Sequence, residues 1–338
     1  MTSKLRVALV GGPMYDALYE PILEEVEVVV HADHPTLNRA VADRLSAGER
    51  LDLISTHGKY APSQARWLLP LQDLVDVDGL APKAVDLCSF RGDRLCVPRN
   101  IDVRILWWRT DRMAAPPPTW DELRAGDAVF GFTGRESGLF GLFYELVQHR
   151  LFDDGLPGGV EAIELLVELA RRAPADLPAW HYDDVDRALL DGRIDCAAAW
   201  PGGHAAIEAS GLSLAPAMYP GGVSYSGCHG WAIPRTCADV DAAAELVQRL
   251  SSAELQRLEP GIPARVDVFA EREPTGAVDA ERLAITARTI ETGMLTYPPI
   301  ETWPEIEDAG WGAINAALRG DLTPAAAAAA VEAALRTT

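Results

Sequence analysis

The sequence predicts an α/β fold with parallel sheets and about two domains. Within residues 5–60, short apolar runs alternate with segments of helical spacing, which is the order that produces a parallel α/β sheet. A second alternation of the same kind follows residue 119. The 338 residues amount to about two domain lengths of ~150 residues each. A hydrophobic fraction of 48% is enough to bury a large core without disulfides.

The first alternation opens with Leu5–Val10, an apolar run that ends at Gly-Gly-Pro and is typical of a buried strand feeding a loop. The expected elements that follow are a helix over 15–25, a strand over 26–30, a helix over 36–47 that Gly48 closes, and a strand over 51–55. Ligands of parallel sheets bind outside the carboxyl ends of the strands. The loops at 11–15 and 56–60 are therefore expected to share one edge.

The second alternation follows an extended segment over 97–108 and a run of three prolines at 116–118. Thr119 is a suitable N-cap for a helix that begins at Trp120. The later expected elements are strands over 128–132, 195–199 and 230–233, and helices over 141–152, 160–172, 185–190 and 240–250. From residue 279 the pattern is almost all helix, with a break at 297–299 and an alanine run at 325–330.

The charge of the chain argues against two classes of partner. Acidic residues outnumber Lys plus Arg by 50 to 30, and the net charge of −20 disfavours nucleic acid and anionic membranes. Only Lys4, Lys59 and Lys83 are lysines. No segment approaches the ~18 apolar residues of a membrane span, and Arg6 interrupts the short apolar run that a signal peptide would need. The sequence thus indicates a soluble chain, with removal of a leader left open.

Five cysteines, an odd number, do not form a disulfide framework in a chain of this length. Cys88 could pair with Cys96 across a tight turn, and Cys228 could pair with Cys237. Buried free thiols are the favoured alternative, because free cysteine commonly behaves as a small core residue.

Several segments point to a family when they are taken together. They are Gly-Gly-Pro-Met-Tyr at 11–15, Leu-Asp-Leu-Ile at 51–54, Trp-Leu-Leu-Pro-Leu-Gln-Asp-Leu at 67–74, Phe-Arg-Gly-Asp-Arg at 90–94 running through Val-Pro at 97–98 into Leu-Trp-Trp-Arg-Thr-Asp at 106–111, Pro-Thr-Trp-Asp-Glu-Leu at 118–123, Leu-Asp-Gly-Arg at 190–193 with Trp200, Gly-Trp-Ala-Ile-Pro at 230–234, Gly-Ile-Pro-Ala-Arg at 261–265, and the close from 311 to 324. In this order they resemble the substrate-binding proteins of ABC importers, in particular the carbohydrate-binding group related to maltose-binding protein.

The resemblance implies a periplasmic-binding-protein-like fold of type II, with two discontinuous α/β lobes, a ligand cleft between them and a hinge. The first lobe would take residues 1–108 and 231–297, and the second 109–230 and 298–338. The lobes would close around a sugar and dock on the permease. No bond is broken in such transport, so no catalytic residue and no enzyme activity are expected.

Sugar recognition needs flat apolar faces for the ring and fork-like polar groups for the hydroxyls. Trp200 matches the stacking tryptophan of the family, although a core tryptophan is the alternative. Tyr15 either contacts the ligand or packs at the start of its helix. The loop at 56–60 is where relatives place polar contacts; the alternative is a solvated loop.

Asp102 lies where relatives carry a carboxylate near the sugar, and Arg104 follows on the same face of the strand. A structural salt bridge explains this pair equally well. Arg135 and Glu136 either reach the cleft or form a surface ion pair. The full set of expected ligand contacts is Gly12, Tyr15, His57, Lys59, Tyr60, Asn100, Asp102, Arg104, Arg135, Glu136, Trp200, Gly202, Gly203, His229, Arg265 and Trp303.

The cleft of this acidic protein would hold an unusual number of potential cations, namely His57, Lys59, Arg99, Arg104, Arg135 and Arg265. If several of them converge, an acidic ligand such as a uronate or a phosphorylated or sulfonated sugar would offset their desolvation best. The alternative is a neutral oligosaccharide or glycoside.

No metal or other cofactor is expected. The segment 31–34, His-Ala-Asp-His, has metal-like spacing but lacks a third and fourth ligand nearby. No Gly-x-Ser-x-Gly elbow is present, which argues against an α/β-hydrolase.

The alternatives to transport are an enzyme on the same two-lobed scaffold and a cytosolic binding or sensor protein. The expected partners are a small saccharide and the ABC permease, with the chain a monomer. Its location would be periplasmic or extracellular and lipid-anchored if a leader was removed, and cytoplasmic otherwise.

Overall fold

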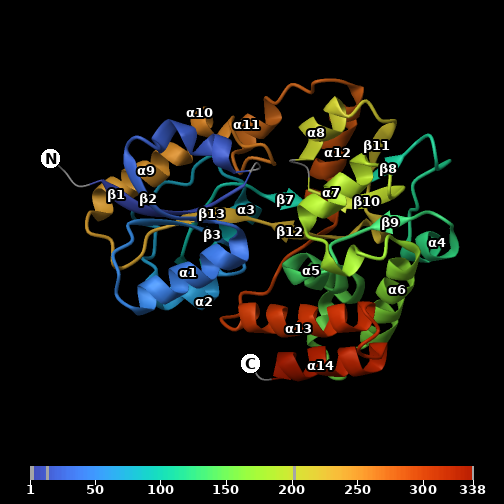
Figure 1. The fold of residues 1–338 in the computed structure, drawn as a ribbon. Helices are drawn as coiled ribbons and strands as arrows, with labels where there is room; N and C mark the ends of the chain where they lie inside the picture. Colours follow the sequence, from blue (N-terminus) through green and yellow to red (C-terminus); the bar gives the residue numbers. More distant parts are fainter. Residues whose placement is uncertain (1–3, 13–14, 201–202, 337–338) are drawn as a thin grey trace. The chain divides into compact units, whose positions relative to one another are not determined.

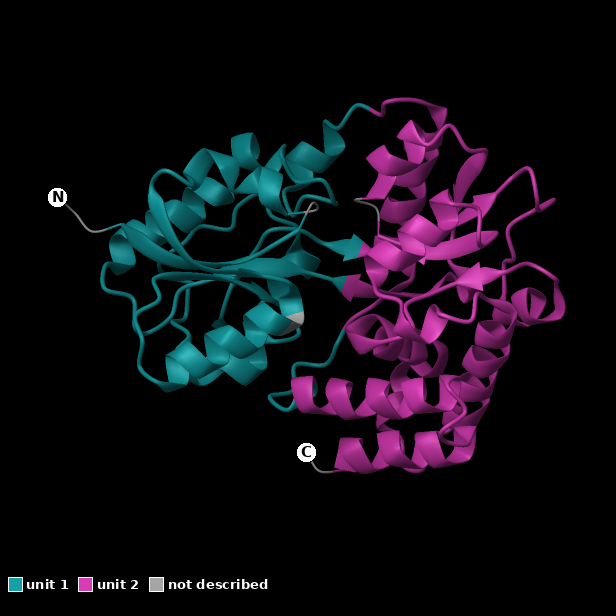
Figure 2. Cartoon of the chain, viewed as in Figure 1, with its two compact units in different colours: residues 1–102, 227–273, 297–303 teal, residues 103–226, 274–296, 304–338 magenta. Residues whose placement is uncertain are grey.

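The computed structural model describes residues 4–12, 15–200 and 203–336. The chain folds into two compact units, which Figure 2 colours teal and magenta. Unit 1 comprises residues 1–102, 227–273 and 297–303, and unit 2 comprises 103–226, 274–296 and 304–338. Both units are therefore built from separate stretches of the chain.

Unit 1 is organised around a five-stranded sheet of order β2-β1-β3-β13-β6. Its strands are β1 (Leu5–Val10), β2 (Val26–Ala32), β3 (Leu53–His57), β6 (Val97–Pro98) and β13 (His229–Ala232). The strand β1 is parallel to β2 and β3, whereas β13 is antiparallel to β3 and β6. In this register His229 lies opposite His57. A strand from late in the chain, β13, thus lies between β3 and β6, which come from its first hundred residues.

Helices cover both faces of this sheet. Figure 1 shows α1 (His34–Ser46) and α2 (Ala61–Gln64) on one face, and α9 (Val240–Leu250) and α10 (Ala253–Gln256) on the other. The smaller elements of unit 1 are α3 (Pro82–Leu87), α11 (Val266–Ala270) and the hairpin of β4 (Ser89–Phe90) and β5 (Asp93–Arg94). The side chain of Asp33 caps α1 by accepting the Thr36 N–H at 2.9 Å.

The predicted helix over 15–25 is wrong. The segment contains two short 3₁₀ helices instead, Asp16–Leu18 and Glu20–Ile22. Pro21 explains the break, because it has no N–H to donate and its ring clashes with the carbonyl of the preceding turn. The third strand also differs from prediction, since β3 runs on to His57 rather than ending at residue 55. His57 is consequently held by sheet pairing and not by a loop.

Unit 2 contains a four-stranded sheet of order β11-β8-β10-β9. Its strands are β8 (Ile105–Arg109), β9 (Phe130–Gly131), β10 (Cys196–Ala199) and β11 (Leu214–Ala217). The strand β8 is antiparallel to both β10 and β11. This pairing places residues 105–109 in unit 2, although the sequence assigned 105–108 to the first lobe. Residues 274–296, also assigned there, belong to unit 2 as well.

The helices of unit 2 are α4 (Trp120–Ala125), α5 (Glu136–Val147), α6 (Gly159–Arg172), α7 (Tyr182–Leu190), α8 (His204–Ala209), α12 (Ala277–Thr292), α13 (Trp303–Leu318) and α14 (Pro324–Arg336). As predicted, Thr119 caps α4, accepting the Glu122 N–H at 3.2 Å. A three-stranded sheet of β7 (Asp102–Val103), β12 (Ser224–Gly227) and β14 (Met294–Leu295) contains two of the unit boundaries.

All five cysteines are free thiols. Neither candidate disulfide forms, and Cys88 lies instead against Cys228 with the two sulfurs 3.9 Å apart. The buried thiols thus act as core residues, the alternative that the sequence favoured. Over the stretches that the structure describes, no helix combines the length and apolar character that crossing a membrane requires.

Candidate ligand-binding site

Three imidazoles gather in unit 1 and form what we call the histidine cluster: His34, His57 and His229. His57 ends β3, His229 begins β13 and His34 begins α1. The ring centroids of His34 and His229 are 4.3 Å apart, those of His57 and His229 4.9 Å, and those of His34 and His57 5.8 Å. The register that places His229 opposite His57 thus builds the cluster directly.

Short polar contacts connect the cluster to its surroundings. Nε2 of His34 lies 2.5 Å from Nδ1 of His229, so one of these two nitrogens carries the proton between them. Nε2 of His229 lies 3.5 Å from the hydroxyl of Tyr15. Nδ1 of His57 accepts the Lys59 N–H at 3.1 Å. The cluster therefore has both donors and acceptors within one small region.

Lys59 brings a positive charge to the cluster. Its ammonium nitrogen lies 4.8 Å from the ring centroid of Tyr60 and 5.0 Å from that of Tyr297, in cation–π geometry. Burial lowers the pKa of His57 well below its usual value, and Lys59 and His34 add to this effect. Burial likewise lowers the pKa of His229 and brings the pKa of His34 to about 3. All three imidazoles are consequently neutral at pH 7.

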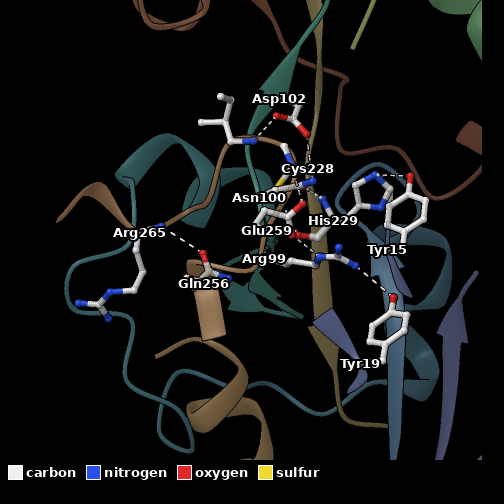
Figure 3. A network of polar contacts seen from close by, with 12 residues as sticks. Tyr15, Tyr19, Arg99, Asn100, Asp102, Cys228, His229, Gln256, Glu259 and Arg265 are labelled. Carbon is white, nitrogen blue, oxygen red and sulfur yellow. Dashed lines mark hydrogen bonds and ion pairs between the residues drawn. The ribbon is translucent and has the colours of Figure 1, made fainter. Parts of the chain in front are cut away.

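A buried ion pair lies beneath Tyr15 and fixes its position. Nε of Arg99 donates to Glu259 at 2.5 Å and Nη1 donates to the Tyr19 hydroxyl at 3.1 Å, as Figure 3 shows. The guanidinium carbon lies 5.0 Å from the ring centroid of Tyr15. Burial raises the pKa of the Tyr15 hydroxyl, so it stays protonated and can donate a hydrogen bond. Arg99 is thus neutralised by Glu259 and acts as support.

Asn100 and Asp102 use their side chains to hold the backbone around His229. Oδ1 of Asn100 accepts the His229 N–H at 2.8 Å, and Nδ2 donates to Asp102 at 3.1 Å. The other oxygen of Asp102 accepts the Ile262 N–H at 2.7 Å. Both residues are buried. Through these hydrogen bonds, Asn100 and Asp102 position the backbone beside the histidine cluster. A ligand contact by either residue stays a prediction.

The remaining arginines of the expected cationic cleft are paired with carboxylates. Arg104 is fully buried and donates to Glu145 at 2.5 Å. Arg265 forms a two-pronged contact with Asp267, both distances being 2.9 Å, and Figure 3 shows its side chain pointing away from Arg99 and His229. Because carboxylates of the protein already pair with Arg104 and Arg265, these two arginines give no reason to expect an acidic ligand.

Arg135 and Glu136 form an ion pair with each other at the start of α5, and Glu136 also lies 3.2 Å from Nε2 of His181. This is the ion pair that the sequence left open.

Trp303 is fully buried, with its ring centroid 5.0 Å from that of Tyr297. Gly12 has a φ of 131°, a backbone conformation that favours glycine, and its N–H donates to Asp16 at 3.2 Å.

Unit 2 contains an aromatic cluster of Tyr182, Trp200 and Tyr225. The ring centroid of Trp200 lies 5.4 Å from that of Tyr225 and 6.1 Å from that of Tyr182, both edge-on. The two tyrosine hydroxyls are 2.9 Å apart. Trp200 is partly exposed, so part of its indole stays open beside the two tyrosines. Gly202 lies outside the described residues.

One carboxylate beside this aromatic cluster was missed by the sequence reasoning. Asp186 lies one turn after Tyr182 on α7, and a Cβ at Gly203 would lie 3.4 Å from its Oδ2. In the part of the chain that the structure describes, no donor bonds its carboxylate. Burial, with Asp183 adding to it, raises the pKa of Asp186 to about 7. The four-residue spacing from Tyr182 could have shown that both share one helix face.

The metal-like segment at 31–34 does not form a metal site. His31 lies 2.8 Å from Asp16, whereas His34 faces His229. Among the residues that the structure describes, no group of three or more His, Cys, Asp or Glu side chains is arranged to hold a metal ion.

The two units, with their separate sheets and discontinuous stretches, define a periplasmic-binding-protein-like fold of type II. The chain belongs to the family of bacterial extracellular solute-binding proteins, whose family model matches residues 25–274. Proteins of this family bind solutes for transporters outside the cytoplasm, and catalysis is not their role. The family therefore indicates a periplasmic or extracellular location.

Solved structures with the same fold cover nearly the whole chain. The maltose-bound MalE3 of T. maritima is 20% identical with a TM-score of 0.87, and 99% of each chain is covered. The GacH receptor of Streptomyces glaucescens, solved unliganded and with acarbose, is 18% identical with a TM-score of 0.81, covering 99% of this chain and 98% of that one. A solute-binding protein of Thermotoga lettingae bound to α-D-tagatose is 22% identical with a TM-score of 0.80, covering 98% and 100%.

Proposed function

We propose that this protein is the substrate-binding protein of an ABC importer and that it binds a sugar or sugar derivative and delivers it to the permease. The observation that carries the proposal is the partly exposed indole of Trp200, which packs in T-shaped geometry with Tyr182 and Tyr225. An exposed aromatic surface suits the C–H side of a sugar ring. The maltose, acarbose and tagatose complexes of the similar structures support a saccharide ligand.

Closure of two lobes around the sugar, with the protein acting as a monomer, is part of this proposal. A thermal-shift screen over neutral and acidic mono- and oligosaccharides tests the binding, because a ligand that binds only the folded state raises its stability by about 2.7 kcal/mol at a hundredfold excess over Kd. Small-angle scattering of any complex tests the closure. A saccharide library that leaves the melting temperature unchanged would contradict the proposal, and turnover of a bound sugar would favour the enzyme alternative.

Trp200→Ala is expected to weaken saccharide binding by about 1–3 kcal/mol, because the stacking surface is lost. Isothermal titration calorimetry with the best saccharide of the screen measures this change. Trp311→Ala is the matched control: this tryptophan of α13 in the same unit donates its indole N–H to Asp308 at 3.2 Å and lies outside the aromatic cluster. Equal affinities for Trp200→Ala and the control would remove Trp200 from the site.

Asp186→Asn is expected to stabilise the unliganded protein by about 1–3 kcal/mol at pH 8 and to weaken saccharide binding. Because burial raises the pKa of Asp186 from 3.8 to about 7, the stability that this group contributes is present at low pH and is lost as the pH rises through 7. The amide removes that cost of ionisation, and it also removes an acceptor for sugar hydroxyls.

Urea unfolding at pH 8 and near pH 4, together with calorimetry of binding, measures both effects of Asp186→Asn. The stabilisation should vanish near pH 4, where the carboxyl is protonated in the folded state. Asp183→Asn, at an exposed position of the same helix, is the control and should change stability by under about 0.5 kcal/mol. A variant that is stabilised but binds saccharide unchanged would show that Asp186 takes no part in recognition.

A further inference from the structure

We infer that the sugar ligand carries a protonated amine, which the carboxylate of Asp186 binds beside the aromatic cluster of unit 2. The inference rests on the proposed function, since it names the ligand class for that site. It is opposite in sign to the acidic ligand considered from the sequence, which relied largely on arginines that are now seen to pair with carboxylates.

Asp186 provides an acidic group that the protein does not pair. On the same helix α7, Asp184 accepts the His181 N–H at 2.9 Å and the Arg187 guanidinium at 3.1 Å. Across the residues that the structure describes, Asp186 accepts no hydrogen bond and forms no ion pair. It is also only partly exposed, so water solvates it incompletely. Such a carboxylate gains more from an opposite charge than a fully solvated one, because a lower local dielectric strengthens the attraction.

The carboxylate lies close to the open aromatic surface. Asp186 follows Tyr182 by one helical turn, so both side chains share one face of α7. The Tyr182 ring centroid is 6.1 Å from that of Trp200. A Cβ at Gly203 would lie 3.4 Å from Oδ2 of Asp186, and the Gly203 N–H donates to the Trp200 carbonyl at 3.2 Å. A sugar that stacks on Trp200 would therefore have Asp186 within its reach.

The charges around this site favour a cation. Part of the Trp200 indole is open, and aromatic rings attract cations over their faces. Asp183, on the same helix as Asp186, adds a second negative charge. Basic side chains on the surrounding elements already meet carboxylates: Arg104 with Glu145, Arg135 and His181 with Glu136, Arg187 with Asp184, and His204 with Asp279 and Glu208. Because these basic groups are engaged elsewhere, the positive charge for Asp186 would come from the ligand.

Binding of an ammonium is coupled to the ionisation of Asp186. Burial raises the pKa of Asp186 to about 7, and Asp183 adds to this effect. The thiol of Cys196 on β10, against which α7 packs, stays neutral because burial raises its pKa to about 12. An ammonium beside the carboxyl group lowers the pKa of Asp186 again, since an opposite charge favours the ionised form. At about pH 6 the carboxyl group therefore gives up about one proton to solvent as the ligand binds, whereas at about pH 8 it is already ionised.

Calorimetric titration at neutral pH tests the inference with glucose, galactose and maltose, each against its 2-amino and 6-amino derivatives. We expect at least one amino sugar to bind at least about tenfold more tightly than its parent. Its affinity should rise by up to about tenfold per pH unit from about pH 5 to about pH 7, where the amine itself stays largely protonated. Titrations near pH 6 in buffers of different ionisation enthalpy should show a release of about one proton.

Asp186→Asn should weaken binding of the amino sugar by about 10- to 100-fold and reduce its advantage over the parent sugar to within about threefold. The variant should also abolish the proton release and the pH dependence of the affinity, which a merely structural role of Asp186 would leave in place. Asp183→Asn, at an exposed position of the same helix, is the matched control and should keep the preference for the amino sugar.

Each outcome of these titrations decides something. Parent sugars that bind as tightly as all their amino derivatives would overturn the inference and leave the proposed function standing. Tighter binding of an amino sugar that persists in Asp186→Asn would overturn the assignment of the amine to Asp186. A protein that binds neither series would contradict the proposed function and the inference together.

Discussion

Glu145→Ala is expected to lower the free energy of unfolding by about 3–5 kcal/mol, because it leaves the buried charge of Arg104 without its partner. Both side chains are 1% exposed, and Nη2 of Arg104 lies 2.5 Å from Glu145. Glu145 also accepts the Tyr225 N–H at 2.9 Å. Its loss therefore disturbs the strand that carries one member of the aromatic cluster. Urea unfolding followed by circular dichroism measures the change.

Two further variants separate the ion pair from a general loss of packing. Replacing both partners, with Arg104→Met and Glu145→Leu together, should recover most of the stability, since an apolar pair of similar volume needs no desolvation of charge. Glu168→Ala breaks the surface pair with Arg124, whose side chains are 45% and 40% exposed, and should cost under about 1 kcal/mol. If Glu145→Ala costs no more than this surface control, the pair is not desolvated as described.

Elements with a strong local signal could be predicted from the sequence. Leu5–Val10, the helix Val240–Leu250 and the cap at Thr119 all match, because apolar periodicity and a capping side chain act over a few residues. One failure has a local cause and the other a distant one. Pro21 prevents the helix expected over 15–25, and the antiparallel β13 extends β3 to His57, which no pattern near residue 57 could show.

The candidate site was predicted in part. Tyr15, His57, Lys59 and Tyr60 were selected from the expected sheet edge, and His229 from the expected second crossing between the lobes. The structure brings these five together in unit 1, and their contact with a ligand stays a prediction. His34 was weighed only as a metal ligand, although its place directly after a strand puts it at the same edge.

The functions of Arg99 and Arg104 depend on partners that are distant in sequence. Glu259 is 160 residues from Arg99, and Glu145 is 41 residues from Arg104. Charge patterns along the chain cannot identify such pairs, because tertiary packing decides which carboxylate meets which guanidinium. The sequence therefore indicated two free cations at Arg99 and Arg104, where the structure shows buried ion pairs. What remains of the expected positive site is Lys59, beside three imidazoles whose pKa values are lowered by burial.

Glu259→Gln is expected to lower the free energy of unfolding by about 3 kcal/mol, since it keeps the shape of the side chain but removes the carboxylate charge that faces buried Arg99. Arg99 is fully buried, and its guanidinium carbon lies 5.6 Å from the ring centroid of Tyr19 and 5.9 Å from that of Trp231. Tryptophan fluorescence during urea unfolding measures the loss. The combined change of Arg99→Met and Glu259→Leu should restore stability to within about 1 kcal/mol of the original protein.

Salt distinguishes this buried pair from a surface one. Glu271→Gln removes the partner of Arg257 in the same unit, where the side chains are 65% and 57% exposed, and should cost under about 1 kcal/mol. That small cost should disappear near 1 M salt, where the Debye length is about 3 Å, whereas the cost of Glu259→Gln should persist because little solvent reaches the pair. A salt-sensitive effect at Glu259 would mean that water reaches Arg99, and the support beneath Tyr15 would then be solvated rather than rigid.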